Sequence, residues 1–317
     1  MTSCCIGKPV RISPAYDDRE HIAALFARNS PYPAVAKYLP DGSDETEQPK
    51  ALDAVLPWFR STWALGGVPL AAGAAEILHN PRFIAAAQQL FPAARIVPTF
   101  VVVNVNAPMP AGVPHVDVPN FHGATRESLP LKLLIAMGAS GLFERWRVVQ
   151  AGAVSWFYEG VGGAFDYWPD GPQGPMHSEK APFTNVAIVA DNDRMYHRIG
   201  AIGEVGTPLP RMTAGARIRF ADNQWVVEDE DECRARYALT AVRCSIVWKA
   251  DVLRSEPAAT AEALTPRQIV DTLERDLSER GERETTTPDP TADPIWIERV
   301  YRFYSRLAQA HVPQPAP

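Results

Sequence analysis

The spacing of apolar residues changes twice along the chain. In residues 1–95 and 251–317 apolar positions recur every three or four residues, as at Ile22 and Phe26, which is the spacing of one helix face. In residues 96–250 they form short runs rich in Val, Ile and aromatic residues, separated by Gly and Pro, which is typical of strands and turns. We therefore expect one domain: a helical N-terminal part, a jelly-roll core in the middle segment, and C-terminal helices packed on that core.

Capping signals mark where several helices should begin. Asn80-Pro81 and the capping box Thr265-Pro-Arg-Gln268 each place a cap before a proline at the first helical position. Asp293-Pro294 should begin a final helix, whose apolar face we expect to pack on the barrel, with a dimer contact as the alternative. The expected strands are Thr99–Asn106, Leu131–Met137, Arg145–Val149, Ala153–Tyr158, Gly163–Trp168, Asn185–Ala190, Ala216–Phe220, Gln224–Val227 and Tyr237–Trp248.

Composition limits the kind of partner. The 317 residues carry a net charge of −6, which argues against nucleic acid, because phosphate binding needs a basic surface. We also expect no signal peptide and no membrane span, since no run reaches about 18 apolar residues. The four cysteines lack framework spacing, and adjacent Cys4-Cys5 has no second cluster nearby, so we expect a reduced, cytoplasmic protein. A small-molecule substrate and a monomer or homodimer are the expected partners.

Two short segments carry the candidate chemistry. His115 and Asp117 are two residues apart, so in an extended segment both side chains point to the same face. His197 follows an apolar run that is typical of a strand. Two imidazoles and one carboxylate on one face of a metal leave the other positions open, a set that suits ferrous iron better than thiolate-bound zinc. We therefore predict His115, Asp117 and His197 as metal ligands and catalytic residues. The group that holds the second N–H of each imidazole is not identifiable from the sequence.

The order of strand, His-x-Asp, further strands, distal His and Arg-x-Ser resembles the Fe(II)/2-oxoglutarate-dependent oxygenases, over roughly Thr99 to Ala250. Within it, Asn185–His197 is similar to the distal-His strand of the taurine and γ-butyrobetaine hydroxylase branch. The resemblance implies a double-stranded β-helix core, Fe(II), 2-oxoglutarate as co-substrate, and O2. It also implies oxidation of a C–H bond of a small molecule, such as an amino acid or specialised metabolite, by hydroxylation, desaturation or cyclisation. The Asp of the motif is retained, which argues against a halogenase.

The same resemblance assigns Arg243 and Ser245 to the far carboxylate of 2-oxoglutarate, because an Arg fork matches carboxylate geometry. The departure is spacing: family members commonly place this Arg within about fifteen residues of the distal His, whereas Arg243 comes much later. Residues 207–236 would then be an inserted loop and hairpin. Arg211 and Arg217 are the rival anchors.

Two other functions remain open at this point. One keeps the iron without 2-oxoglutarate, as in the oxidase that makes isopenicillin N. The other is a non-catalytic jelly-roll binding protein with incidental His and Asp residues. Several further side chains could line a pocket or serve the fold alone: His122, His177, Asn104, Asn106, Trp156, Tyr158, Tyr167 and Trp168. His21, His79 and His311 lie in helical contexts and are expected to be structural.

Overall fold

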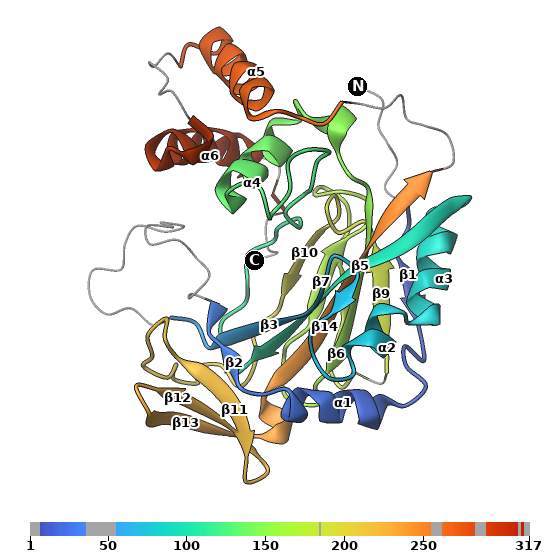
Figure 1. Cartoon of the computed structure of the whole chain (residues 1–317). Helices are drawn as coiled ribbons and strands as arrows, with labels where there is room; N and C mark the ends of the chain where they lie inside the picture. Colours follow the sequence, from blue (N-terminus) through green and yellow to red (C-terminus); the bar gives the residue numbers. More distant parts are fainter. Residues whose placement is uncertain are drawn as a thin grey trace.

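A computed structural model describes residues 7–35, 55–183, 185–254, 262–282, 290–309 and 312–313 (Figure 1). Cys4, Cys5 and His311 lie outside these residues.

The largest element is a seven-stranded antiparallel sheet. Its strands run in the order β1 (Val10–Ile12), β9 (Ala187–Ala190), β6 (Gln150–Phe157), β14 (Arg243–Arg254), β5 (Ala94–Asn106), β3 (Trp58–Leu65) and β4 (Val68–Pro69). The two long strands β5 and β14 lie side by side at its centre, where Ser245 pairs with Asn104 and Val247 with Val102. Because residues alternate between faces, every second residue of β14 points toward the interior of the fold.

A smaller sheet faces the first one. It is made of β10 (Tyr196–Ile199), β7 (Phe165–Trp168) and β8 (His177–Glu179), and isolated bridges from Met109 and His115 add the segment after β5 to its edge. Buried side chains from both sheets, among them Trp156 and Phe165, fill the space between them together with Phe183 of the loop between β8 and β9. The mainly β fold with flanking helices and a jelly-roll core is therefore confirmed.

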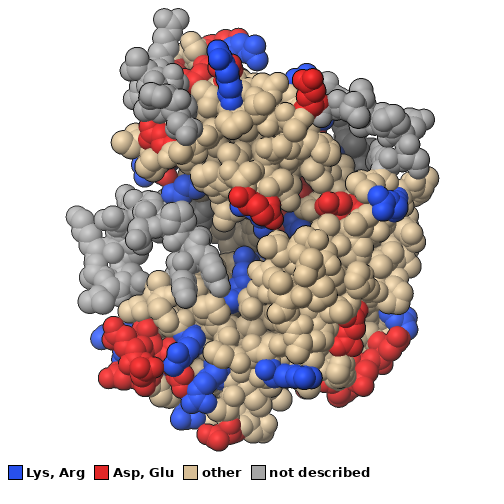
Figure 2. Space-filling model, viewed as in Figure 1, with Lys and Arg blue, Asp and Glu red and all other residues tan. Residues whose placement is uncertain are grey.

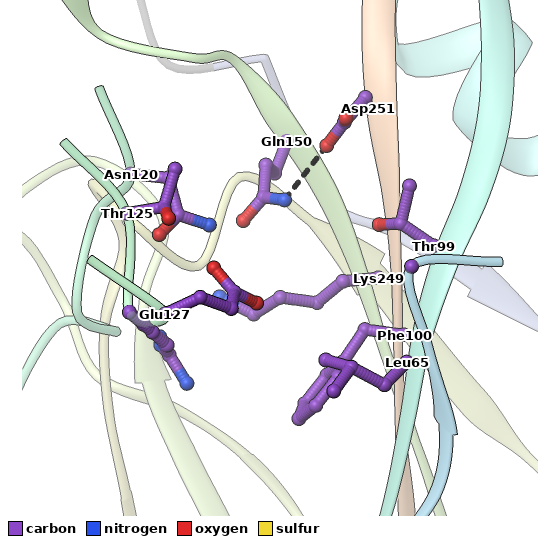
Figure 3. Close-up of a pocket in the computed structure, with 11 residues that line it drawn as sticks. Leu65, Thr99, Phe100, Asn120, Thr125, Glu127, Gln150, Lys249 and Asp251 are labelled. Carbon is purple, nitrogen blue, oxygen red and sulfur yellow. Dashed lines mark hydrogen bonds between the residues drawn. The ribbon is translucent and has the colours of Figure 1, made fainter. Parts of the chain in front are cut away.

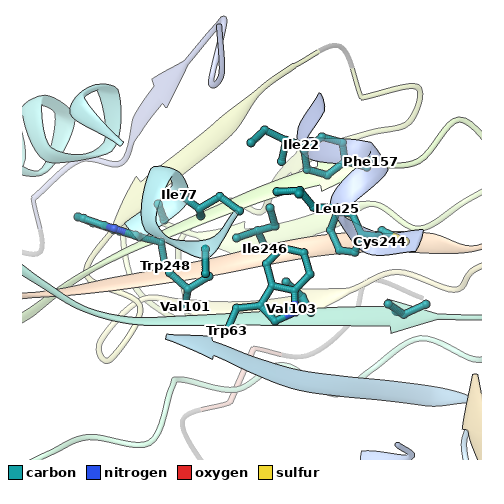
Figure 4. Packing of buried hydrophobic residues seen from close by; sticks show 14 of the residues in the cluster. Ile22, Leu25, Trp63, Ile77, Val101, Val103, Phe157, Cys244, Ile246 and Trp248 are labelled. Carbon is teal, nitrogen blue, oxygen red and sulfur yellow. The ribbon is translucent and has the colours of Figure 1, made fainter. Parts of the chain in front are cut away.

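Three helices cover the outer face of the large sheet: α1 (Arg19–Arg28), α2 (Ala74–Leu78) and α3 (Pro81–Leu90). Figure 4 shows Ile22, Leu25 and Ile77 of these helices packed on the outward residues of β5 and β14. The Asn80 side chain caps α3 by accepting from Arg82 N and Phe83 N, as predicted. Burial of this outer layer leaves the opposite face of the sheet for the interior.

The N-terminal part contains strands as well as helices, and the sequence analysis missed them. β3 and β4 extend the large sheet beyond β5, and β1 closes its other edge. The segment Trp58–Leu65 does not alternate between apolar and polar residues, because Arg60, Ser61 and Thr62 separate two apolar runs, so its pattern does not have the period of a strand.

The strand predicted at Leu131–Met137 is wrong, because these residues belong to helix α4 (Leu131–Ser140). A short apolar run does not distinguish a buried strand from a buried helix, and this one is rich in Leu, Ala and Met, which favour a helix. The strand predicted at Arg145–Val149 is also wrong, since a 3-10 turn occupies Glu144–Trp146 and β6 begins only at Gln150. The strand predicted at Tyr237–Trp248 is interrupted at Leu239–Ala241 and continues as β14.

The C-terminal helices form a second packed unit with α4. α5 (Pro266–Glu279) begins at the Thr265 capping box, as predicted, and α6 is Pro294–Gln309. Ile297, Val300 and Tyr304 of α6 are buried, as its apolar pattern predicted, but against α4 and its neighbouring loops rather than directly on the barrel.

The expected insertion after the distal His is also present. β11 (Arg217–Ala221), β12 (Gln224–Asp229) and β13 (Glu232–Ala238) form consecutive hairpins in a separate sheet with β2 (Tyr32–Pro33). The chain therefore leaves the core after β10 and returns to it at β14, which explains the long interval between His197 and Arg243.

Candidate metal centre

The two candidate histidines are hydrogen-bonded to each other through the backbone. His115 N donates to His197 O at 3.0 Å, and His197 N donates to His115 O at 2.9 Å. Residues directly opposite each other in an antiparallel pair project their side chains to the same face, and the two imidazole centroids are 4.6 Å apart. The backbone of Asp117 is held in the same way, by donation from its N–H to Asn192 O at 2.9 Å.

This pairing gathers the three predicted ligands. One ligand atom from each of His115, Asp117 and His197 lies within 4.8 Å of the other two. Each Nδ1 is 3.0 Å from a backbone carbonyl two residues earlier, Val113 O for His115 and Met195 O for His197. A carbonyl only accepts, so each Nδ1 carries the proton and each neutral ring presents a bare Nε2 lone pair. These carbonyls are the partners that the sequence did not identify.

Asp117 divides its carboxylate between two neighbours. Oδ1 lies 3.6 Å from His197 Nε2, while Oδ2 lies 2.9 Å from the Nζ atom of Lys249. Lys249 Nζ is also 2.8 Å from Asp193 Oδ1. Lys249 and Asp193 are almost fully buried, at 4% and 5% exposure. Lys249 was not among the predicted site residues. A signal was present in the sequence, because a lysine within the apolar run of β14, on the same face as Arg243 and Ser245, is unusual for a buried strand.

Burial and the neighbouring charges shift the pKa values of these residues. Burial alone would raise the pKa of Asp117, but the Lys249 ammonium beside it holds the pKa well below its usual value. Burial and the neighbouring Asp117 raise the pKa of Asp193. Burial would lower the pKa of Lys249, yet the two carboxylates raise it. Desolvation within the site and the adjacent His197 lower the pKa of His115 and so favour its neutral form, even though the residue keeps solvent access.

Arg243 lies in the interior of the barrel on the same face of β14 as Lys249. It is 1% exposed, and its Nε donates to Gly163 O at 2.7 Å. Its Nη2 is buried and lacks a hydrogen-bond partner. The same is true of Trp156 Nε1 and Asn106 Oδ1. These residues are cross-strand neighbours, because Arg243 pairs with Asn106 and Ser245 with Trp156. Burial lowers the pKa of Arg243 to about 9, and no described carboxylate is paired with it. A buried guanidinium with a free N–H is suited to receive an anion.

The rival arginines lie elsewhere. Arg211 is exposed, and Arg217 is exposed and paired with Glu228 and Asp231. Among the other candidates, His122 and His177 are exposed, whereas Trp156, Tyr158 and Trp168 are buried in the interior. His21 bonds Glu76 at 2.9 Å across two helices, in keeping with a structural role.

A cavity of about 420 Å³ adjoins the metal centre through Lys249. Figure 3 shows Lys249 entering it from the sheet and Glu127 from the opposite loop, with Phe100 and Leu65 forming an apolar wall. Gln150 Nε2 donates to Asp251 Oδ1 at 2.8 Å along another side. In the space-filling view a hollow in the middle of this face is bordered by both acidic and basic side chains (Figure 2). The cavity therefore combines a large apolar wall with several polar and charged groups.

No protein-family model and no curated protein matches the sequence. Solved structures with a similar fold include an oxidoreductase of the 2OG-Fe(II) oxygenase family from Burkholderia pseudomallei, at 14% identity and TM-score 0.41, covering 78% of this chain and 89% of that one. The carbocyclase SnoK from nogalamycin biosynthesis, described as non-haem and α-ketoglutarate-dependent, is 9% identical at TM-score 0.40, covering 82% and 90%. HygX from Streptomyces hygroscopicus, solved with nickel, 2-oxoglutarate and hygromycin B, is 9% identical at TM-score 0.38, covering 78% and 83%. Because the sequence identities and the TM-scores are low, these similarities do not establish the function of this chain.

Across the described part of the chain, none of the helices has the length and apolar character that crossing a bilayer requires.

Proposed function

We propose that this protein is a non-haem Fe(II)- and 2-oxoglutarate-dependent oxygenase that oxidises a C–H bond of a small molecule. The observation that carries the proposal is the convergence of His115, Asp117 and His197, each with a ligand atom within 4.8 Å of the others, while both Nδ1 atoms are held by backbone carbonyls. Two imidazoles and one carboxylate on one side of a ferrous ion leave positions for a bidentate 2-oxo acid and for O2.

The residues present fit the co-substrate as well. Arg243 and Trp156 offer unpartnered buried N–H groups, and Ser245 is nearby on the same strand face. Donors placed in this way suit the far carboxylate of 2-oxoglutarate, whose negative charge would compensate the buried guanidinium. Such a role favours the 2-oxoglutarate-dependent enzyme over the iron oxidase that needs no co-substrate and over a non-catalytic binding protein, since neither requires an unpaired cation inside the barrel.

Bound iron and 2-oxoglutarate supply the oxidising chemistry: R–H, O2 and 2-oxoglutarate give R–OH, succinate and CO2. The chain contributes position and exclusion of water. The backbone bonds of His115 and His197 fix their rings, Asp117 supplies the charged ligand, and the interior aromatic residues keep the co-substrate end of the site dry.

The cavity beside Lys249 is the proposed substrate site. Its volume, about 420 Å³, suits a small molecule. Glu127, Asp251 and the oxygen of Gln150 supply acceptors, so a substrate with hydroxyl or amino groups fits better than a hydrocarbon.

The deciding experiment is anaerobic addition of Fe(II) and then 2-oxoglutarate to metal-free protein. We expect the visible charge-transfer band of the chelate in wild type and none in His197→Ala. Iron binding without a band, and oxygen consumption without succinate release, would favour the 2-oxoglutarate-independent oxidase. Absence of iron binding would favour the non-catalytic protein.

A further inference from the structure

The group Asp117–Lys249–Asp193 is unusual because it places a buried ammonium against a residue that is itself a candidate metal ligand. Lys249 Nζ lies 2.9 Å from Asp117 Oδ2 and 2.8 Å from Asp193 Oδ1. Burying three charges is costly unless each is paired. Lys249 is paired on both sides, so it is held in one position by the fold.

The contact is selective for one oxygen. Oδ2 of Asp117 is occupied by Lys249, whereas Oδ1 is directed to His197 Nε2, 3.6 Å away on the side of the other two ligands. A free carboxylate can bind a metal through one oxygen or through both. With Oδ2 against an ammonium, a cation that approaches this oxygen is repelled by the like charge of Lys249, so Oδ1 is the favoured ligand atom.

We propose that Lys249 is a positioning residue that restricts Asp117 to one-oxygen coordination, with Asp193 holding Lys249 in place. The inference rests on the proposed metal site and adds a specific consequence: the position that the second oxygen would occupy stays open for co-substrate or O2. The group carries a net charge of −1, so Lys249 orients the ligand while Asp193 compensates its repulsion of the cation.

The test uses a variant pair matched in charge. Lys249→Met/Asp193→Asn removes one positive and one negative charge and leaves the group at −1, so a change in metal affinity reports orientation rather than net charge. We expect Mn(II), titrated into metal-free full-length protein, to bind about 10- to 100-fold more weakly than to wild type, the range for loss of a group that orients a ligand. Lys132→Met/Glu298→Gln removes another half-buried ion pair, between α4 and α6 and outside the metal centre, and should leave Mn(II) affinity unchanged.

A second measurement covers the case in which the double variant does not fold. In a crystal structure of the Mn(II)-loaded wild type, we expect one oxygen of Asp117 on the metal and the other within hydrogen-bond distance of Lys249 Nζ. Wild-type Mn(II) affinity in a folded double variant, or both oxygens of Asp117 on the metal in the wild type, would overturn the proposal. If wild type and His197→Ala both fail to bind Mn(II), the proposed function itself fails, which is a different outcome.

Discussion

Arg243 Nε donates a hydrogen bond to the carbonyl oxygen of Gly163 at 2.7 Å, although the two residues are 80 positions apart. The bond links the large sheet to the loop before β7 and fixes the guanidinium in the interior. One N–H group, at Nη2, is left without a partner.

We therefore expect Arg243→Met to raise the KM for 2-oxoglutarate while sparing iron binding. Loss of a charge-assisted hydrogen bond corresponds to roughly 1.5–3 kcal/mol, or about 10- to 150-fold. Succinate release as a function of 2-oxoglutarate concentration measures the effect. Arg211→Met and Arg217→Met are matched controls at exposed positions, and a rise confined to either of them would move the anchor there.

Each of His115→Ala, Asp117→Ala and His197→Ala should abolish metal binding, because each removes one of three ligands and no other described His, Cys, Asp or Glu joins the group. Calorimetric titration of Mn(II) into metal-free protein checks this. His177→Ala is the control, since that imidazole is exposed and lies against Tyr167. Retained binding in any of the three variants would remove that residue from the ligand set.

Asp191 predicts a pH effect on stability. Burial, with the charge of Asp193, raises the pKa of Asp191 from 3.8 to about 6. Between these pH values the folded state keeps the proton on Asp191, whereas the unfolded chain releases it. The free energy of unfolding therefore falls as pH rises from about 4 to about 6. We expect Asp191→Asn to be more stable than wild type at pH 7.5, by up to about 3 kcal/mol, with the difference vanishing near pH 4.

Urea unfolding at the two pH values measures this difference. Asp170→Asn, which removes a carboxylate at an exposed position, is the control. A pH-independent effect of Asp191→Asn would assign its stability change to packing instead.

Gly152 packs against Asn192, whose backbone contacts Asp117 in the candidate metal centre. A Cβ placed there would lie 2.9 Å from Asn192 Nδ2 and 3.4 Å from Asn192 Cγ, which is too close. Asn192 O accepts from Asp117 N, so displacement of Asn192 reaches the carboxylate ligand. We expect Gly152→Ala to cost about 1–3 kcal/mol of unfolding free energy and to weaken Mn(II) binding. Gly215→Ala is the control, because its nearest neighbour is 3.4 Å away; identical behaviour of the two variants would contradict the prediction.

The sequence identified the parts of this site that depend on residue type and alternation. His115 and Asp117 share a face because they are two apart, whereas Arg243 was assigned from the Arg-x-Ser resemblance, since alternation alone did not decide whether it is buried. The sequence did not reveal contacts between residues that are far apart along the chain. Lys249 meets Asp117 only after the chain has closed into a barrel, and the carbonyls of Val113 and Met195 carry no side-chain signal. The strand predicted at Leu131–Met137 was wrong for another reason: its Leu, Ala and Met residues favour a helix, but so short an apolar run does not show which period it follows.

The two imidazoles proposed as ligands receive their orientation from main-chain carbonyls, and the proposed carboxylate ligand receives its orientation from a side chain. Substitutions around the site therefore have little means of switching the tautomer of either histidine, because backbone groups persist through mutation. Asp117 is the one ligand whose environment can be edited by changing a single neighbour. An engineer who wished to adjust metal preference in this scaffold would thus begin at position 249.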